Sequence, residues 1–293
     1  MKLGKEHLYV WEIKPGFAHE NEAGIRIAQI VKGAGLSLTK PSEGKVNLIA
    51  EYDGLCSVNE EVLYQVNMIE DIVVATINNR RPVKKGDIVA GVRVIPLLIQ
   101  DHKIQAVEQV ESAVVSIKAY RPHKVGIITT GNEVYQGRIT DAFGPVIKQK
   151  VEEYGCEVIQ QIFVPDDAGQ IADAVKNLLT AGAELILATG GMSVDPDDVT
   201  PSGIRQAGAE IVTYGAPVLP GSMFLMAYLD EVPIMGLPGC VMYARRTIFD
   251  IVLPRVMARD PISVAELSQL GEGGLCLDCK TCVFPNCGFG KGW

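Results

Sequence analysis

Apolar and polar residues follow two different rhythms along the chain. After residue 123, short runs of branched apolar residues, typical of buried strands, cover 125–130, 157–164, 184–189 and 210–214. The stretches between them have apolar residues at helical spacing, over 145–154, 168–180 and 200–207. Strands that alternate with helices of this length predict an α/β domain in three layers (α/β/α), with helices on both faces of a mostly parallel sheet.

The earlier part of the chain is richer in strand patterns. A helix is predicted over 20–31, and a second helix begins after Ser57 or Asn59. Branched apolar residues predict a strand over 72–77, and a longer apolar run covers 88–99. These patterns predict a smaller, strand-rich α+β module, in which no catalytic constellation stands out.

The spacing of apolar residues changes at Arg121-Pro122, and four of the seven cysteines lie close to the end of the chain. A chain of 293 residues is long enough for about two domains with buried cores. The sequence therefore predicts three parts: a strand-rich N-terminal module over 1–121, an α/β domain over 122–260 and a cysteine-rich tail over 261–293.

Charge and hydropathy exclude two classes of partner. The net charge of −8 lies wholly after residue 123, where 20 acidic residues face 12 basic ones, so the basic footprint of a nucleic-acid-binding domain is absent. The longest apolar run, 88–99, is interrupted by Arg93 and Pro96 and is too short to span a bilayer. No apolar stretch follows the first residues, so no secretory signal is predicted. We expect a soluble, cytoplasmic protein without nucleic-acid or membrane partners.

Each predicted strand of the α/β domain runs into a polar or glycine-rich loop. The loops contain Thr130-Gly131 with Glu133, Pro165-Asp166, Gly190-Gly191 with Ser193, and Pro238-Gly239, which precedes a helix predicted from about Cys240. Parallel sheets bind ligands beyond the carboxyl ends of their strands, and glycine lets backbone N–H groups approach an oxyanion closely. Any one of these loops is typical of a simple turn or helix cap. Their joint occurrence at successive strand ends favours a ligand site.

Carboxylates crowd the loop that follows Ser193. Asp195, Asp197 and Asp198 are too many for an unassisted phosphate site, and they make sense if Mg²⁺ lies between them and the phosphates of a ligand. The alternative is that Asp198, just before Thr200, only caps a helix.

With these loops, the segment from Lys124 to about Ala258 resembles the molybdopterin-binding domain shared by molybdopterin adenylyltransferases and molybdopterin molybdotransferases. The most specific piece runs from Gly190-Gly191-Met192-Ser193 through Asp198-Val199-Thr200-Pro201, with Pro165-Asp166 and Leu237-Pro238-Gly239 in the order of the family. The resemblance implies a three-layer α/β/α domain that assembles as a dimer or trimer, and a site for molybdopterin or its adenylate.

By position, Asp166 and Asp198 match the two aspartates around the pterin phosphate and metal, which makes them the candidate catalytic residues. The candidate ligand-binding residues are Thr130, Gly131, Glu133, Asp141, Gly190, Gly191, Ser193, Asp195, Asp197, Pro238 and Gly239. Asp141 is the kept residue of a loop that otherwise departs from the molybdotransferase pattern. Ser222 stands where those enzymes tend to have a lysine that could hold molybdate, and with these departures binding is better supported than any turnover.

Three functions stay open. The resemblance implies a molybdopterin-binding protein of molybdenum-cofactor biosynthesis and, if it is an enzyme, a Mg²⁺-dependent adenylyl- or molybdo-transferase. A non-catalytic carrier or sensor of the cofactor, with a redox or metal tail, is the second. The third is a nucleotide hydrolase on the same fold.

Four cysteines with the spacing C-x2-C-x2-C-x4-C end the chain: Cys276, Cys279, Cys282 and Cys287. Thiolates spaced in this way resemble an iron–sulfur cluster loop. Structural zinc is the rival, although it usually draws two pairs from well-separated segments. The remaining alternative is a reduced tail without metal.

Overall fold

The computed structural model describes residues 15–193 and 199–291 and divides the chain into two compact units, 1–119 and 120–293. Within the described residues, no helix combines the length and the apolar character needed to cross a bilayer.

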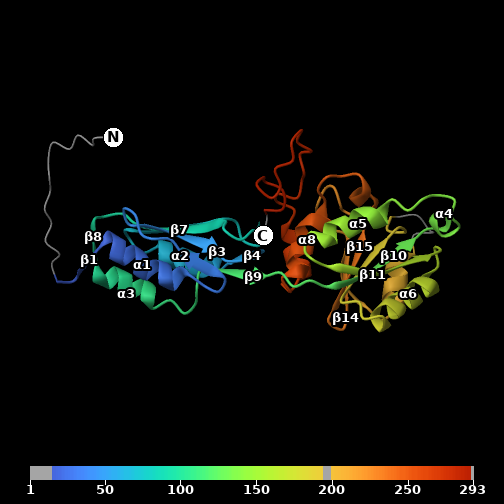
Figure 1. Cartoon of the computed structure of the whole chain (residues 1–293), viewed down its shortest axis with the longest axis horizontal. Helices are drawn as coiled ribbons and strands as arrows, with labels where there is room; N and C mark the ends of the chain where they lie inside the picture. Colours follow the sequence, from blue (N-terminus) through green and yellow to red (C-terminus); the bar gives the residue numbers. More distant parts are fainter. Residues whose placement is uncertain (1–14, 194–198, 292–293) are drawn as a thin grey trace. The chain divides into compact units, whose positions relative to one another are not determined.

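The first unit packs helices against antiparallel sheets (Figure 1). The sheets have the strand orders β2-β3-β7-β5, β6-β4-β9 and β1-β8. The helices are α1 (Glu20–Val31), α2 (Glu60–Asn67) and α3 (Asp101–Glu108). The strands are β1 (Phe17–His19), β2 (Leu36–Leu38), β3 (Lys45–Ala50), β4 (Gly54–Val58), β5 (Ile72–Thr76), β6 (Pro82–Val83), β7 (Ile88–Val94), β8 (Leu98–Gln100) and β9 (Val115–Ala119).

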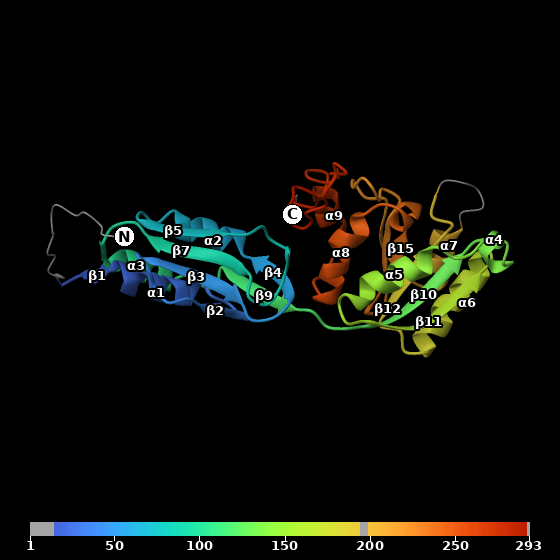
Figure 2. The same ribbon diagram turned by 45° about the horizontal axis from the view of Figure 1, so that its top comes forward.

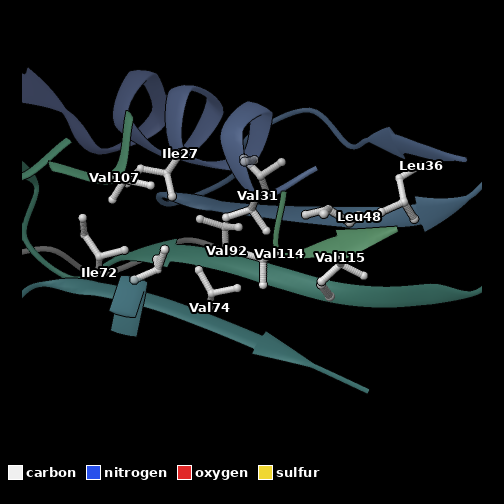
Figure 3. Packing of buried hydrophobic residues seen from close by; sticks show 14 of the residues in the cluster. Ile27, Val31, Leu36, Leu48, Ile72, Val74, Val92, Val107, Val114 and Val115 are labelled. Atoms are coloured by element: carbon white, nitrogen blue, oxygen red, sulfur yellow. The ribbon is translucent and has the colours of Figure 1, made fainter. Parts of the chain in front are cut away.

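The core of this unit lies between α1 and the central strands, as Figure 3 shows. Ile27 and Val31, one helical turn apart, point from α1 toward Leu48 and Val92 of β3 and β7 (Figure 3). All four side chains are fully buried, so this face of the helix is held by apolar packing. The α+β prediction for this part is confirmed.

The second unit is built on one six-stranded sheet with the order β11-β10-β12-β15-β14-β13 (Figure 2). Only β14 runs against its neighbours, so the sheet is mostly parallel, as predicted. The strands are β10 (Lys124–Thr130), β11 (Glu157–Val164), β12 (Leu185–Thr189), β13 (Glu210–Tyr214), β14 (Leu225–Leu229) and β15 (Val232–Leu237). The helices are α4 (Asn132–Tyr135), α5 (Phe143–Glu152), α6 (Ala168–Thr180), α7 (Thr200–Gln206), α8 (Ile248–Met257) and α9 (Val264–Gln269).

Alternate residues of each central strand feed two separate cores. Ile127 and Leu187 belong to the core that includes residues of α5 and α8, whereas Ile128 and Ile186 belong to the core with residues of α6 and α7. Because successive side chains of a strand point to opposite faces, the sheet is covered on both sides. The three-layer α/β/α prediction is confirmed.

The helix predicted from about Cys240 is wrong. After β15 the chain makes only a short 3-10 turn, η1 (Gly239–Met242), and α8 begins at Ile248. A capping box sets this start: the Thr247 hydroxyl accepts the N–H of Phe249 at 3.2 Å, and the Asp250 carboxylate accepts the N–H of Thr247 at 2.8 Å.

The cysteine-rich tail is part of the second unit and follows its body closely. Leu219 donates its N–H to the carbonyl of Gly274 and accepts the N–H of Cys276, both at 2.8 Å. Phe289 is buried in the core that includes α8. The tail is thus anchored at both ends of its cysteine-bearing stretch.

Candidate functional site

The polar loops of the second unit meet at one edge of the sheet, which we call the strand-end edge. In the parallel register, Thr130 pairs with Val164, Thr129 with Thr189, and Thr189 with Leu237. The loops that follow therefore begin side by side. They start at Gly131 after β10, Pro165 after β11, Gly190 after β12 and Pro238 after β15.

Two glycines give the loop after β12 its shape. Gly190 has φ +82°, and a Cβ there would collide with the carbonyl oxygen of Thr130. Gly191 has φ +52°, and its Cβ would lie 2.8 Å from the Thr200 hydroxyl. Both positions require glycine for its backbone freedom and for the close approach of neighbouring chain. The loop therefore presents backbone, not side chain, to the strand-end edge.

Buried threonine hydroxyls hold this loop from beneath. Thr200 Oγ1 donates to the carbonyl of Gly190 at 2.9 Å and lies 3.2 Å from Thr130 Oγ1. Both threonine side chains are buried, and the backbone N–H of Thr200 also bonds the carbonyl of Gly191 at 3.3 Å. Thr130 is one of the predicted ligand residues. The role of Thr200 was not predicted, because its place before Pro201 indicates only a helix start.

Asp166 ties the second loop to the first. Its Oδ2 accepts the N–H of Asn132, the first residue of α4, at 3.0 Å. The second carboxylate oxygen can still face a ligand or a cation. The neighbouring Asp167 caps α6 by accepting the N–H of Gln170 at 2.8 Å. Asp166 thus lies beside Gly131, as a shared ligand site would require.

Asp141 is held at the start of α5, where it accepts the N–H groups of Phe143 and Gly144 at 2.9 and 3.1 Å. Gln161 of β11 donates to Asp141 at 2.6 Å and to Thr129 Oγ1 at 2.9 Å. Asp141 is therefore linked to the end of β10, while its carboxylate is occupied by structural hydrogen bonds.

A groove of about 690 Å³ opens beside Asp141. Tyr135 and Ile139, both exposed, form part of its wall with Phe163 of β11. Lys148 of α5 brings a cation to the same groove. A flat, polar-edged ring would find apolar faces here together with hydrogen-bonding side chains.

The remaining candidates divide into placed and unplaced residues. Glu133 is exposed in the first turn of α4, Pro238 is buried, and Gly239 and Ser193 are exposed. Tyr214, at the end of β13, donates its hydroxyl toward the carbonyls of Met192 and Ser193, each at 3.1 Å. This contact was not predicted, because no local sequence pattern connects Tyr214 with that loop. Asp195, Asp197 and Asp198 lie outside the described residues.

The four tail cysteines lie elsewhere, in the wall of one pocket of about 490 Å³ that we call the cysteine pocket. All seven cysteines of the chain are free thiols. Within the described residues, no three His, Cys, Asp or Glu side chains are grouped so that they could hold a metal ion. The structure therefore brings the four cysteines to one pocket without a preformed metal centre.

Positive charge gathers at the cysteine pocket. Arg245 and Arg246 line it, and both precede α8, contrary to the prediction of a helix from Cys240. Asp250 is buried and accepts from both Lys150 at 2.5 Å and Arg246 at 2.8 Å. Burial lowers the pKa of Arg246, but the charge of Asp250, hydrogen bonding to it and the Cys282 thiol outweigh this effect, so its pKa is raised.

Comparisons with known proteins agree on the second unit. Residues 126–258 match the family described as "Probable molybdopterin binding domain". The molybdopterin molybdenumtransferase of Haemophilus influenzae is 27% identical over 183 residues, which cover 59% of this chain and 43% of that protein. The protein of the same name from Synechococcus elongatus is 28% identical over 169 residues, which cover 52% of this chain and 42% of that protein. The chain thus spans less than half the length of these curated relatives.

Solved structures give a weaker likeness. The molybdopterin biosynthesis enzyme MoaB from Thermus thermophilus is 24% identical, with a TM-score of 0.39, over 46% of this chain and 91% of that one. The likeness to the molybdopterin biosynthesis MoeA protein from Pyrococcus horikoshii covers 83% of this chain and 80% of that chain. The sequence identity is 15% and the TM-score is 0.38.

Proposed function

We propose, from the match of residues 126–258 to the probable molybdopterin binding domain, that this chain binds molybdopterin or its adenylate at the strand-end edge. The observation that carries the proposal is the convergence there of four loops, one of which has glycines at both of its close approaches. The function would lie in molybdenum-cofactor biosynthesis, as the names of the curated relatives suggest.

The phosphate of such a ligand would lie over the loops that start at Gly131 and Gly190. Backbone N–H groups that face an oxyanion bind it without the entropy cost of ordering long side chains. The pterin ring would occupy the groove between Tyr135 and Phe163, where Gln161 and Lys148 can meet its polar edge.

Mg²⁺ would offset the acidity of this half of the chain. Asp166 offers one carboxylate oxygen beyond its bond to Asn132. Asp195, Asp197 and Asp198, which lie outside the described residues, are the candidates for further oxygen ligands. In the enzymatic form, a molybdopterin adenylyl- or molybdo-transferase, the barrier falls through positioning and charge neutralisation, without a covalent nucleophile.

A second candidate is a non-catalytic carrier or sensor of the cofactor, favoured by the cysteine pocket, which could hold an iron–sulfur cluster or zinc.

Assembly as a dimer or trimer and a cytoplasmic location remain predictions from the resemblance and the sequence. Light scattering of the purified chain tests the assembly.

The decisive experiment is a calorimetric titration with molybdopterin, with Mg²⁺ or with EDTA. The wild-type chain is compared with Asp166→Asn and Asp198→Ala, and with Asp173→Asn, an exposed carboxylate on α6, as the matched control. We expect binding that weakens about tenfold or more without Mg²⁺ and in the first two variants. Unchanged binding in those variants, or none in the wild type, contradicts the proposal.

Turnover separates the candidate functions. Adenylate transfer from ATP to molybdopterin, with release of pyrophosphate, would identify an adenylyltransferase, and transfer of molybdate to the bound ligand would identify a molybdotransferase. Binding without transfer would favour the carrier. Release of phosphate or pyrophosphate from nucleotides in the absence of molybdopterin would favour the hydrolase.

A further inference from the structure

The cysteine pocket has one anchored pair of thiols and one exposed pair. Cys276 and Cys287 are half-buried and pack against the core that includes α8, whereas Cys279 and Cys282 are exposed. All four are in the wall of the same pocket. The four cysteines thus come from one short stretch of the tail and share one pocket, although among the described residues no three of them are yet grouped closely enough to hold a metal ion.

Backbone hydrogen bonds shape this stretch of the tail. Arg245 donates from one guanidinium nitrogen to the carbonyls of Cys279 and Lys280, both at 2.9 Å. The N–H of Cys276 bonds the carbonyl of Leu219. Because these contacts use backbone atoms, the thiols of Cys276 and Cys279 stay available to a ligand.

The surroundings of the pocket favour negative charge. Its charged lining residues are Arg245, Arg246 and Asp278, so cations outnumber the single carboxylate. Arg246 shares Asp250 with Lys150, and one carboxylate cannot neutralise both cations. A thiolate site, which is anionic, gains from this excess of positive charge.

Aromatic side chains close the apolar part of the pocket. Phe284 and Phe289 both line it, with ring centroids 6.1 Å apart. The guanidinium of Arg246 lies over the Phe284 ring, 5.1 Å from its centroid. Proteins stabilise iron–sulfur clusters and set their reduction potentials partly by burying them beside apolar rings. Cationic groups near the sulfurs have a similar effect.

We propose that the cysteine pocket binds a 4Fe–4S cluster through Cys276, Cys279, Cys282 and Cys287. Each thiol loses its proton to solvent when its sulfur bonds an iron, and the exposed thiols of Cys279 and Cys282 turn toward the anchored pair. Zinc would hold its four sulfurs about 2.3 Å from a single point. The 490 Å³ pocket, with thiols in its wall, suits the larger cluster, which takes one thiolate on each iron.

The test is anaerobic reconstitution of the full chain with ferric chloride, sodium sulfide and dithiothreitol, which reduces part of the ferric iron so that the cluster forms with both ferric and ferrous iron. After desalting, we expect about four iron and four acid-labile sulfide per chain, with a broad visible absorption that bleaches on reduction by dithionite. Cys279→Ser and Cys282→Ser should lose most of the iron, because each removes a ligand. Both residues are exposed, so circular dichroism should show an intact fold.

Cys240→Ser is the matched control, since Cys240 is a half-buried free thiol of the same unit that does not line the pocket. It should bind iron as the wild-type chain does. Absence of iron from the reconstituted wild type, equal iron in the two tail variants, or stoichiometric zinc that excludes iron would each overturn the proposal.

Discussion

The strand-end edge and the cysteine pocket differ in what holds their polar groups. At the strand-end edge, buried hydroxyls and backbone atoms already satisfy one another: Thr200 bonds Gly190, and Asp166 bonds the first N–H of α4. At the cysteine pocket, Arg245 fixes carbonyls of the backbone, while the thiols of Cys279 and Cys282 lie at the surface.

This difference suggests two ways of preparing a binding site. Loops fixed by a parallel sheet can be in place before the ligand arrives, so little ordering cost is left for the binding step. A thiolate site in a tail gains its final order from the metal, because ligation and local folding are coupled. A substitution that breaks a buried contact of the strand-end edge should therefore destabilise the fold, whereas loss of an exposed tail thiol should leave the fold intact.

The largest effect is expected at Gly190. In Gly190→Ala the new methyl group would collide with the Thr130 carbonyl, and φ of +82° is strained for alanine. Strain of this kind costs on the order of 1–3 kcal/mol, and we expect molybdopterin binding to fall about tenfold or more. Urea denaturation and calorimetric titration measure the two effects.

Gly239→Ala separates fold from ligand at the same edge. No atom lies within 4 Å of a Cβ built at Gly239, so the variant should be as stable as the wild type. If a ligand approaches the backbone there, binding alone weakens. Wild-type binding in both glycine variants would break the comparison, because the loops would then not be prepared for a ligand.

The next effect is expected at Thr200. Thr200→Val keeps the shape of the side chain but leaves the Gly190 carbonyl without its hydroxyl donor in a buried site. The cost should be about 1–3 kcal/mol, seen in thermal unfolding as a fall in Tm of about 2–4 °C per kcal/mol. Thr180→Val, whose hydroxyl bonds a carbonyl at an exposed helix end, is the control and should change Tm little.

The bounds of a helix could be predicted from the sequence where the residues that determine them are close together along the chain. The helices over 20–31 and 168–180 have the predicted bounds, since apolar spacing and caps such as Asp167 lie within a few residues. The start of α8 differs because the Thr247–Asp250 capping box determines it, and Leu-Pro-Gly does not.

The candidate site divides in the same way. A parallel sheet brings the loops after its strands to one edge, so their convergence follows from alternating strands and helices. The contacts of Thr200 with Gly190 and of Tyr214 with Ser193 depend on the packing of segments distant from each other in sequence or separated by a loop. No local pattern carries that information.

A smaller effect is expected at Tyr214. Tyr214→Phe removes the hydroxyl that reaches the Met192 and Ser193 carbonyls but keeps the ring. A hydrogen bond of this kind contributes about 0.5–1.5 kcal/mol, so binding of molybdopterin should weaken about three- to tenfold. Tm should change little, because the bond to Ser193 is exposed and the bond to Met192 is only part-buried. A large fall in Tm with normal binding would assign Tyr214 to the fold instead.

The smallest effect is expected at His123, which precedes β10 at the opposite end from the strand-end edge. Burial lowers the pKa of His123, against the opposing effects of its bond to the Arg121 carbonyl and of Glu184. Because the folded pKa is below the unfolded value of about 6.5, the unfolded chain binds more protons as the pH falls through that value. Stability is therefore lost on the acid side.

Thermal unfolding from about pH 7.5 down to about pH 5.5 tests this sign. The wild type should lose more Tm over that interval than His123→Gln does, whereas His102→Gln, at an exposed site of the first unit, should follow the wild type. Since His123 touches no strand-end loop, its variant should bind molybdopterin normally at about neutral pH. Weakened binding in His123→Gln would mean that a change at the other end of the sheet alters the strand-end loops. The hydrogen bonds within these loops would then not be enough to fix them.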